Sequence, residues 1–216
     1  MEILQIDCSL IEGSRRYCSP EAADIIAGMV DGCFGGLHYL GSGDFHYITK
    51  IICDFIPEPF DLLLFDHHPD MQEPAFGGIL SCGGWVRDML EGNSRLGNVT
   101  IVGIDPSLKE ETGGFPGRVR VFCEGDTVVP VEGDRPVYVS VDKDVFCPCF
   151  ARTNWGQGSL TMPIFGEILA MLLKGRRVLG ADICGSLPIS DGGTPEDCAI
   201  NRDADEDIAL ELSRYL

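Results

Sequence analysis

Basic residues are scarce in this chain of 216 residues. It has 16 Lys and Arg against 34 Asp and Glu, a formal net charge of −18, and no run of Lys or Arg. Nucleic acids and anionic membranes are bound through clusters of positive charge. Both are therefore excluded as partners, and a small molecule is the expected ligand.

Long apolar runs are also missing. No stretch approaches the ~20 apolar residues of a membrane span, and the opening segment MEILQIDCSL has neither the cationic nor the apolar part of a secretion signal. Ten cysteines are present, but no pair of C-x-x-C motifs suggests a zinc site. We predict a cytoplasmic protein whose thiols are reduced and serve mostly as small apolar core residues.

Short apolar runs alternate with longer segments of helical periodicity, which is typical of an α/β fold with a mainly parallel sheet. Runs such as DLLLF and VTIVGI are apolar at consecutive positions, as expected for strands covered on both faces. One domain, residues 1–216, fits the length. The predicted strands are 3–6, 37–40, 61–65, 99–104, 119–122, 136–141 and 177–181. The predicted helices are 20–30, 47–55, 77–91, 162–174 and 203–215.

Polar residues follow three of these strands. In an open α/β sheet the ligand site lies beyond the carboxyl ends of the strands, so these residues are candidates for function. The first segment, GSGDFHY, contains Asp44 and His46; the second, DHHPD, spans Asp66 to Asp70; the third, DKDV, contains Asp142 and Asp144.

Alternation along an extended chain places Asp66, His68 and Asp70 on one side and His67 on the other. Asp142 and Asp144 share a side for the same reason. A single D-x-D or a lone His is usually a helix cap or a solvated residue, but three such segments after apolar strands form a joint signal.

If the two strands are neighbours, the carboxylates meet in a small volume, where cations must separate them. Such a donor set suits Mn²⁺ or Mg²⁺, with Fe²⁺ or Zn²⁺ as alternatives. The donors suffice for two ions, and water bridging two such ions is acidified toward hydroxide.

These segments resemble the arginase/agmatinase ureohydrolases. DHHPD is similar to their D-x-H-x-D, SVDKDVFCP to their S-x-D-x-D-x-x-D-P, and NWGQGSLT to their glycine-rich loop. VGIDPS and GADICGSLP resemble later strands, and the matches occur in family order. The resemblance implies a three-layer α/β/α sandwich with a centre of two Mn²⁺ ions per chain.

The resemblance also implies roles for individual residues. One metal is held by a His of the GSGDFHY loop with Asp66, Asp70 and Asp142, and the other by Asp66, His68, Asp142 and Asp144. Asp70 additionally orients the hydroxide. Phe45 interrupts the family's Asp-His pair. We favour His46 as the loop ligand, with Asp44 as the alternative, because either side chain could reach the centre from a glycine loop. His38 and His67 are expected to be structural or supporting residues.

Two further positions depart from the family pattern. Cys82 stands where the family has a His that shuttles protons, so Cys82 is the candidate proton donor. Gly185 stands where the family has the Glu that binds a guanidinium group, which argues against arginine or agmatine as substrate. The C-x-C pair Cys147 and Cys149 suggests a redox pair, although buried spectator residues are the simpler expectation.

The leading hypothesis is a metal-dependent hydrolase of a non-peptide C–N bond in a small amidino, imino or amide compound. One alternative is a catalytically inactive metal-binding protein on the same fold, and another is a deacetylase-like enzyme with a single Zn²⁺. The resemblance also makes a homo-oligomer plausible.

Overall fold

Seven parallel strands form the central sheet of the protein, a computed structural model that describes residues 2–74 and 77–216. Their order across the sheet is β1-β3-β9-β8-β4-β6-β7. The strands are β1 (Ile3–Gln5), β3 (Leu37–Tyr39), β4 (Phe60–Phe65), β6 (Leu96–Ile104), β7 (Val119–Cys123), β8 (Val137–Asp142) and β9 (Val178–Cys184).

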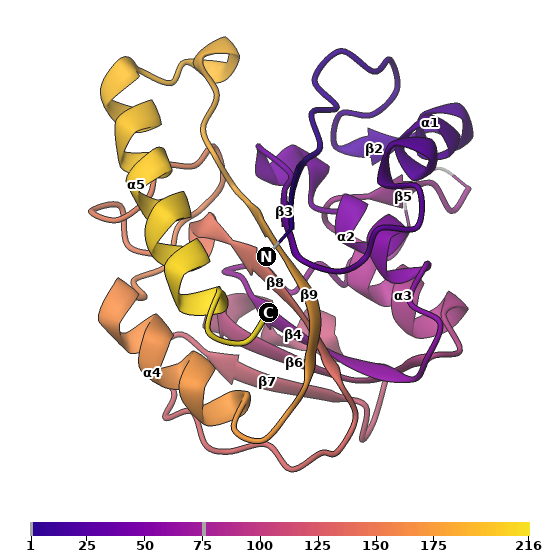
Figure 1. Cartoon of the computed structure of the whole chain (residues 1–216), viewed down its shortest axis with the longest axis vertical. Coiled ribbons are helices and arrows are strands. Elements are labelled where there is room, and N and C mark those ends of the chain that lie inside the picture. Colours follow the sequence, from indigo (N-terminus) through magenta and orange to yellow (C-terminus); the bar gives the residue numbers. More distant parts are fainter. Residues whose placement is uncertain (1, 75–76) are drawn as a thin grey trace.

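Helices cover both faces of this sheet (Figure 1). One face packs against α1 (Pro20–Val30), α2 (Ile48–Cys53) and α3 (Trp85–Gly92), and the other against α4 (Met162–Leu172) and α5 (Pro195–Leu212). The predicted three-layer α/β/α sandwich with a parallel sheet is therefore confirmed. Among the described residues, no helix combines the length and the apolar character that a membrane crossing requires.

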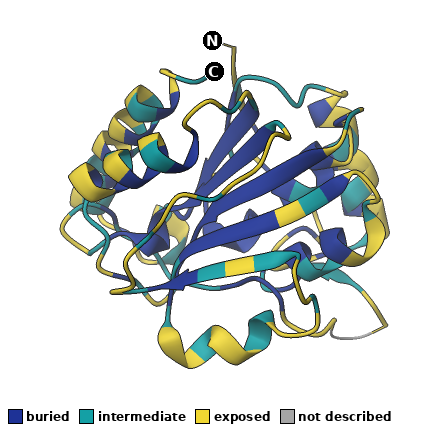
Figure 2. Cartoon of the chain, turned by 90° about the horizontal axis from the view of Figure 1, so that it is seen from below, coloured by how far each residue is buried: buried dark blue, intermediate teal, exposed yellow. Residues whose placement is uncertain are grey.

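The two central strands are buried along their whole length. Every residue of β4 and β8 is buried, as expected when helices cover both faces. Figure 2 shows the inner strands in dark blue and the outward sides of the helices largely in yellow. Consecutive apolar residues in these two segments of the sequence therefore reflect burial from two sides.

The direction of chain progression reverses between β4 and β8. From β4 the chain crosses through α3 to β6 on one side, whereas from β8 it crosses through α4 to β9 on the other. Because the two helices cover opposite faces, a crevice opens at the carboxyl ends of these strands. The Asp66 and Asp142 segments both begin at this crevice.

Two helices differ from their predicted ranges. The predicted helix 77–91 begins only at Trp85, because a short strand, β5 (Leu80–Ser81), pairs antiparallel with β2 (Tyr17–Cys18); residues 75 and 76 lie outside the described residues. The predicted helix 203–215 begins eight residues earlier, at Pro195. Thr194 caps it, with a capping box to Asp197, a signal hidden in a segment that reads as a glycine-rich loop.

The prediction that Cys147 and Cys149 are buried spectator residues with reduced thiols is wrong. Cys147 and Cys149 form a disulfide, and neither side chain is buried. The local turn after β8 brings the two thiols together outside the core. The expectation of small apolar core residues is met by the six free cysteines that are buried, namely Cys8, Cys18, Cys53, Cys82, Cys123 and Cys184.

Candidate metal centre

His46 reaches the crevice from the loop between β3 and α2. A 3-10 turn, Gly43–Phe45, precedes it and is capped by Ser42, whose Oγ accepts from the Asp44 N–H at 3.3 Å. The buried Nδ1 atom of His46 lies 3.2 Å from Asp66 Oδ2, 3.0 Å from Asp70 Oδ2 and 3.5 Å from Asp142 Oδ2. One ring nitrogen thus faces three carboxylates.

The opposite ring nitrogen of His46 is fixed by a buried relay. Ser140 Oγ donates to Asp182 Oδ1 at 2.6 Å and lies 2.9 Å from Nε2 of His46. Because the single hydroxyl hydrogen is directed to Asp182, Nε2 is the donor in the second contact. In the neutral ring this leaves Nδ1 without a hydrogen, which is the form that binds a metal.

The DHHPD segment follows β4 and turns sharply at its end. Asp66 Oδ1 accepts from the His68 N–H at 2.6 Å, while Asp70 adopts a left-handed backbone with φ +50°. The Trp85 indole donates to Asp70 Oδ2 at 2.5 Å and holds that carboxylate. His67 turns away from the centre, with Nδ1 3.1 Å from the Gly103 carbonyl oxygen. The alternation predicted for this segment therefore matches the structure.

The third segment follows β8, which pairs directly with β4. Asp142 Oδ1 accepts from the Asp144 N–H at 2.9 Å. Asp144 reaches back to the DHHPD segment, where Oδ2 lies 2.7 Å from His68 Nδ1 and Oδ1 accepts from the His67 N–H at 2.9 Å. The two segments are thus tied together by carboxylate contacts.

In the part of the chain that the structure describes, three overlapping groups of donor atoms result, and within each group the atoms lie within 4.8 Å of one another. The groups are His46–Asp66–Asp70, Asp66–His68–Asp144 and His46–Asp142–Cys184. All six residues proposed as metal ligands from the sequence lie in this assembly and line a cavity of about 200 Å³. Cys184, whose Sγ is 3.1 Å from Asp142 Oδ2, was missed, because the sequence marks it only as part of a strand.

Burial and mutual repulsion shape the electrostatics of the centre. Burial, together with the Asp66 charge, raises the pKa of Asp144 to about 6, and burial likewise raises the pKa values of Asp66, Asp70 and Asp142. For His68, burial lowers the pKa, but the Asp144 and Asp66 carboxylates outweigh this effect and raise it to about 11. Without cations the assembly therefore retains protons.

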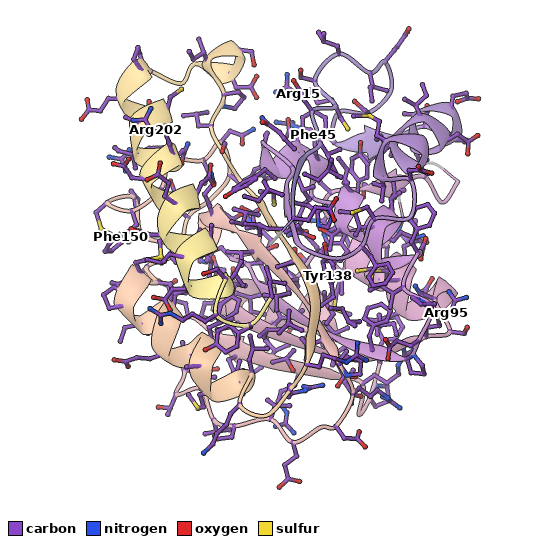
Figure 3. The ribbon with its side chains drawn as sticks, in the orientation of Figure 1. Arg15, Phe45, Arg95, Tyr138, Phe150 and Arg202 are labelled. Atoms are coloured by element: carbon purple, nitrogen blue, oxygen red, sulfur yellow. A yellow bond between two sulfur atoms is a disulfide. The ribbon has the colours of Figure 1, made fainter. Side chains whose placement is uncertain are left out.

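Asp44, the alternative loop ligand, is engaged elsewhere. Its carboxylate lies 2.8 Å from Arg15 Nε and 3.2 Å from Arg16 Nε, and it accepts from the Trp155 indole at 3.2 Å. Figure 3 shows Arg15 near Phe45, toward the same end of the molecule. The geometry therefore favours His46 over Asp44 as the donor.

The two positions that depart from the ureohydrolase pattern both border the centre. Cys82 lines the cavity, and burial together with nearby Asp70 raises its pKa to about 12, so that the thiol stays protonated at neutral pH. Gly185 has φ +92°, and a Cβ there would lie 2.2 Å from Asp142 Oδ1 and 2.7 Å from Lys143 N. This backbone excludes any side chain at position 185.

The sequence of the chain was compared with protein-family models and with the sequences of known proteins. No protein-family model matches it. A protein of Thermotoga maritima, described as uncharacterized, is 33% identical over 178 residues, covering 81% of this chain and 68% of that protein. The chain belongs to one family with this Thermotoga protein.

Solved structures identify the fold that this family shares. Proclavaminate amidino hydrolase from Streptomyces clavuligerus superposes with a TM-score of 0.69 at 19% identity, over 92% of this chain and 72% of that one. Arginase from Medicago truncatula superposes with a TM-score of 0.70 at 20% identity, over 89% of this chain and 65% of that one. The fold is that of the arginases, so the resemblance read from the sequence is confirmed at this level.

Proposed function

We propose that this arginase-fold protein is a Mn²⁺-dependent hydrolase that cleaves a non-peptide C–N bond in a small amidino, imino or amide compound. The observation that carries the proposal is the overlap of two donor groups at Asp66, because a shared carboxylate is what a pair of ions requires. The names of the similar structures, an amidino hydrolase and an arginase, support this class of reaction.

The donor set fits divalent ions. Four buried carboxylates and two imidazoles converge, and among the described donors only one, Cys184, is a sulfur atom. Such a set of mainly oxygen and nitrogen donors suits Mn²⁺ better than a metal that selects thiolates. One ion is proposed to be held by His46, Asp66, Asp70 and Asp142. The other is proposed to be held by Asp66, His68, Asp142 and Asp144. Such ions supply a Lewis acid and lower the pKa of water.

Two residues of the chain are proposed to orient the attacking water and to donate a proton. Asp70, held by the Trp85 indole, accepts a hydrogen bond from the attacking water and orients it toward the trigonal carbon. Cys82 carries its proton at neutral pH and borders the same cavity, which makes it the proposed donor to the leaving amine.

The assignment is tested by Asp142→Asn, with Asp24→Asn, an exposed position on α1, as the matched control. Metal content is measured after Mn²⁺ loading and gel filtration, and turnover is measured with amidines, ureas, formimino compounds and acylated amines. We expect Asp142→Asn to lose both metal and turnover, and Asp24→Asn to keep both. Full metal and unchanged activity in Asp142→Asn would overturn the proposal.

A second candidate, a metal-binding protein without hydrolytic activity, is favoured by the two departures at Cys82 and Gly185. It predicts stoichiometric metal with no turnover across the same compounds. The number of ions also distinguishes a deacetylase-like enzyme, for which one tightly bound Zn²⁺ per chain is expected.

A further inference from the structure

As far as the structure describes its lining, the cavity above the metal centre has one permanent positive charge and no carboxylate outside the centre. Apart from the four aspartates of the centre, its described lining contains no Asp or Glu, and its only Lys or Arg is Arg16. A substrate with a cationic group would thus compete for the metal-directed carboxylates. Gly185, beside Asp142, supplies no anionic side chain either, because a Cβ there would lie 2.2 Å from Asp142 Oδ1.

Arg16 has hydrogen-bonding capacity that the described part of the protein does not use. Its Nε lies 3.2 Å from Asp44 Oδ1, and its Cζ lies 5.2 Å from the centre of the Trp155 ring. Neither of its terminal nitrogens has a hydrogen-bond partner among the described residues, and the side chain is 53% exposed. Arg15 draws on the same Asp44 carboxylate, so that one negative charge is shared by two guanidinium groups.

The backbone of Arg16 is held in an unfavourable conformation. Its φ is +62°, in the left-handed region that residues other than glycine rarely adopt. Among the described residues that line this cavity, Asp70 is the other non-glycine residue in that region. The Arg16 N–H donates to the Asp44 carbonyl at 3.1 Å, and the Cys82 N–H donates to the Arg16 carbonyl at 2.9 Å. Such conformations persist where the surroundings fix them, and they concentrate at functional sites.

We propose that Arg16 binds a carboxylate of the substrate at the mouth of the cavity. The inference rests on the proposed function and narrows it: the substrate is a small acid whose neutral C–N group lies at the metal centre and whose carboxylate pairs with the two free nitrogens of Arg16. Guanidinium groups recognise carboxylates through two parallel N–H donors, which is the capacity that Arg16 retains.

The test compares two ureido compounds of equal chain length and opposite charge, 4-ureidobutyrate and N-carbamoylputrescine. Their dissociation constants are measured by calorimetry on the Mn²⁺-loaded protein, for the wild type, Arg16→Gln and Arg15→Gln. Arg15 also pairs with Asp44 but does not line this cavity, so Arg15→Gln is the matched control. Metal content is determined for each preparation.

We expect the wild type to prefer the carboxylate compound, and Arg16→Gln to weaken its binding at least about tenfold, the loss typical of a charged hydrogen bond. Arg15→Gln is expected to change it by less than about twofold. Equal binding of the carboxylate compound by wild type and Arg16→Gln, or no binding by either, would overturn the inference.

Turnover separates this inference from the proposed function. Arg16-dependent binding without hydrolysis of any compound supports the carboxylate site and contradicts the hydrolase. Hydrolysis of N-carbamoylputrescine at the rate of 4-ureidobutyrate, unaffected by Arg16→Gln, supports the hydrolase and contradicts the carboxylate site.

Discussion

The two ends of strand β4 carry buried aspartates with opposite surroundings. At the start, Asp61 Oδ2 lies 2.6 Å from Arg176 Nη2, and its Oδ1 accepts from the Asn98 N–H at 2.8 Å. At the end, Asp66 faces imidazoles and other carboxylates. The first charge is balanced by an arginine, which is permanently charged. In the described part of the chain, no lysine or arginine pairs with the second.

The lysine nearest to the centre sharpens this contrast. Lys143 stands between Asp142 and Asp144 in the sequence, yet its buried Nζ atom lies 2.6 Å from Asp205 Oδ1 and donates to Ser186 Oγ at 2.6 Å. Alternation directs its side chain to the other face. A structural carboxylate thus comes with a lysine or an arginine. The carboxylates at the end of β4 instead contact imidazoles, whose protons a metal ion can displace, and this points to an external ion.

The largest expected effect of breaking this contrast is at Asp61. Asp61→Asn leaves the guanidinium of Arg176, only 9% exposed, without its anion, and loss of one partner of a buried pair costs about 3 kcal/mol. We expect the free energy of unfolding, measured by urea denaturation, to fall by about that amount, with Mn²⁺ content unchanged. A loss of metal in this variant would contradict the division between the two ends of the strand.

Asp66→Asn is the counterpart at the other end. Burial and the nearby Asp70 charge raise the pKa of Asp66, which means that the folded protein disfavours its charge. In the presence of EDTA the variant is therefore expected to unfold at the same or a higher urea concentration than the wild type. Addition of Mn²⁺ should then stabilise the wild type alone. Destabilisation of the metal-free protein, as large as in Asp61→Asn, would show that Asp66 is a structural residue.

Parts of this centre could be predicted from the sequence, because alternation in an extended segment is a local rule. It placed Asp66, His68 and Asp70 on one side and His67 on the other, and the structure agrees. The pairing of β4 with β8 needed the additional assumption that the strands are neighbours. The resemblance to the ureohydrolases supported that assumption, and the strand register confirms it.

Other contributors depend on contacts between distant segments, for which the sequence has no local signal. Arg16 lines the cavity because its backbone is left-handed just before the short antiparallel pair of β2 and β5. Trp85 reaches Asp70 because α3 begins at Trp85 and not at residue 77, where the sequence predicts its start. Asp182 lies in a buried strand and is joined to His46 through Ser140. The sequence shows an aspartate at this position, but it does not show that Ser140 is its hydrogen-bond partner.

The relay behind His46 provides the next prediction. Ser140→Ala removes the acceptor of the Nε2 hydrogen bond. It also removes the hydrogen bond from Ser140 to Asp182, whose Oδ2 atom has no hydrogen-bond partner among the described residues. Loss of such a supporting contact costs about 10- to 100-fold in metal affinity. Competition with a fluorescent chelator measures this loss, and Ser42→Ala, which removes a backbone cap nearby, is the control. Equal Mn²⁺ affinity in Ser140→Ala and wild type would exclude a supporting role for the relay.

The smallest effect expected is the pH dependence of metal stabilisation. The pKa of Asp144 is raised to about 6 in the metal-free protein, so between its ordinary value of 3.8 and about 6 the folded form binds the proton more tightly than the unfolded form. This contribution to stability is therefore present at low pH and is lost as the pH rises through 6. The raised pKa of His68, about 11, acts in the same direction from pH 6.5 upward.

A metal must displace these protons to bind. At a pH below the pKa of such a group, the Mn²⁺ affinity is therefore expected to rise about tenfold for each proton displaced when the pH is raised by one unit. The difference in melting temperature between Mn²⁺-loaded and EDTA-treated protein should accordingly grow from pH 5 to pH 6. Asp144→Asn, which has no carboxyl proton to displace at this position, is expected to show a smaller increase. A difference that is constant with pH would mean that the carboxylates at the ends of β4 and β8 are already ionised without cations.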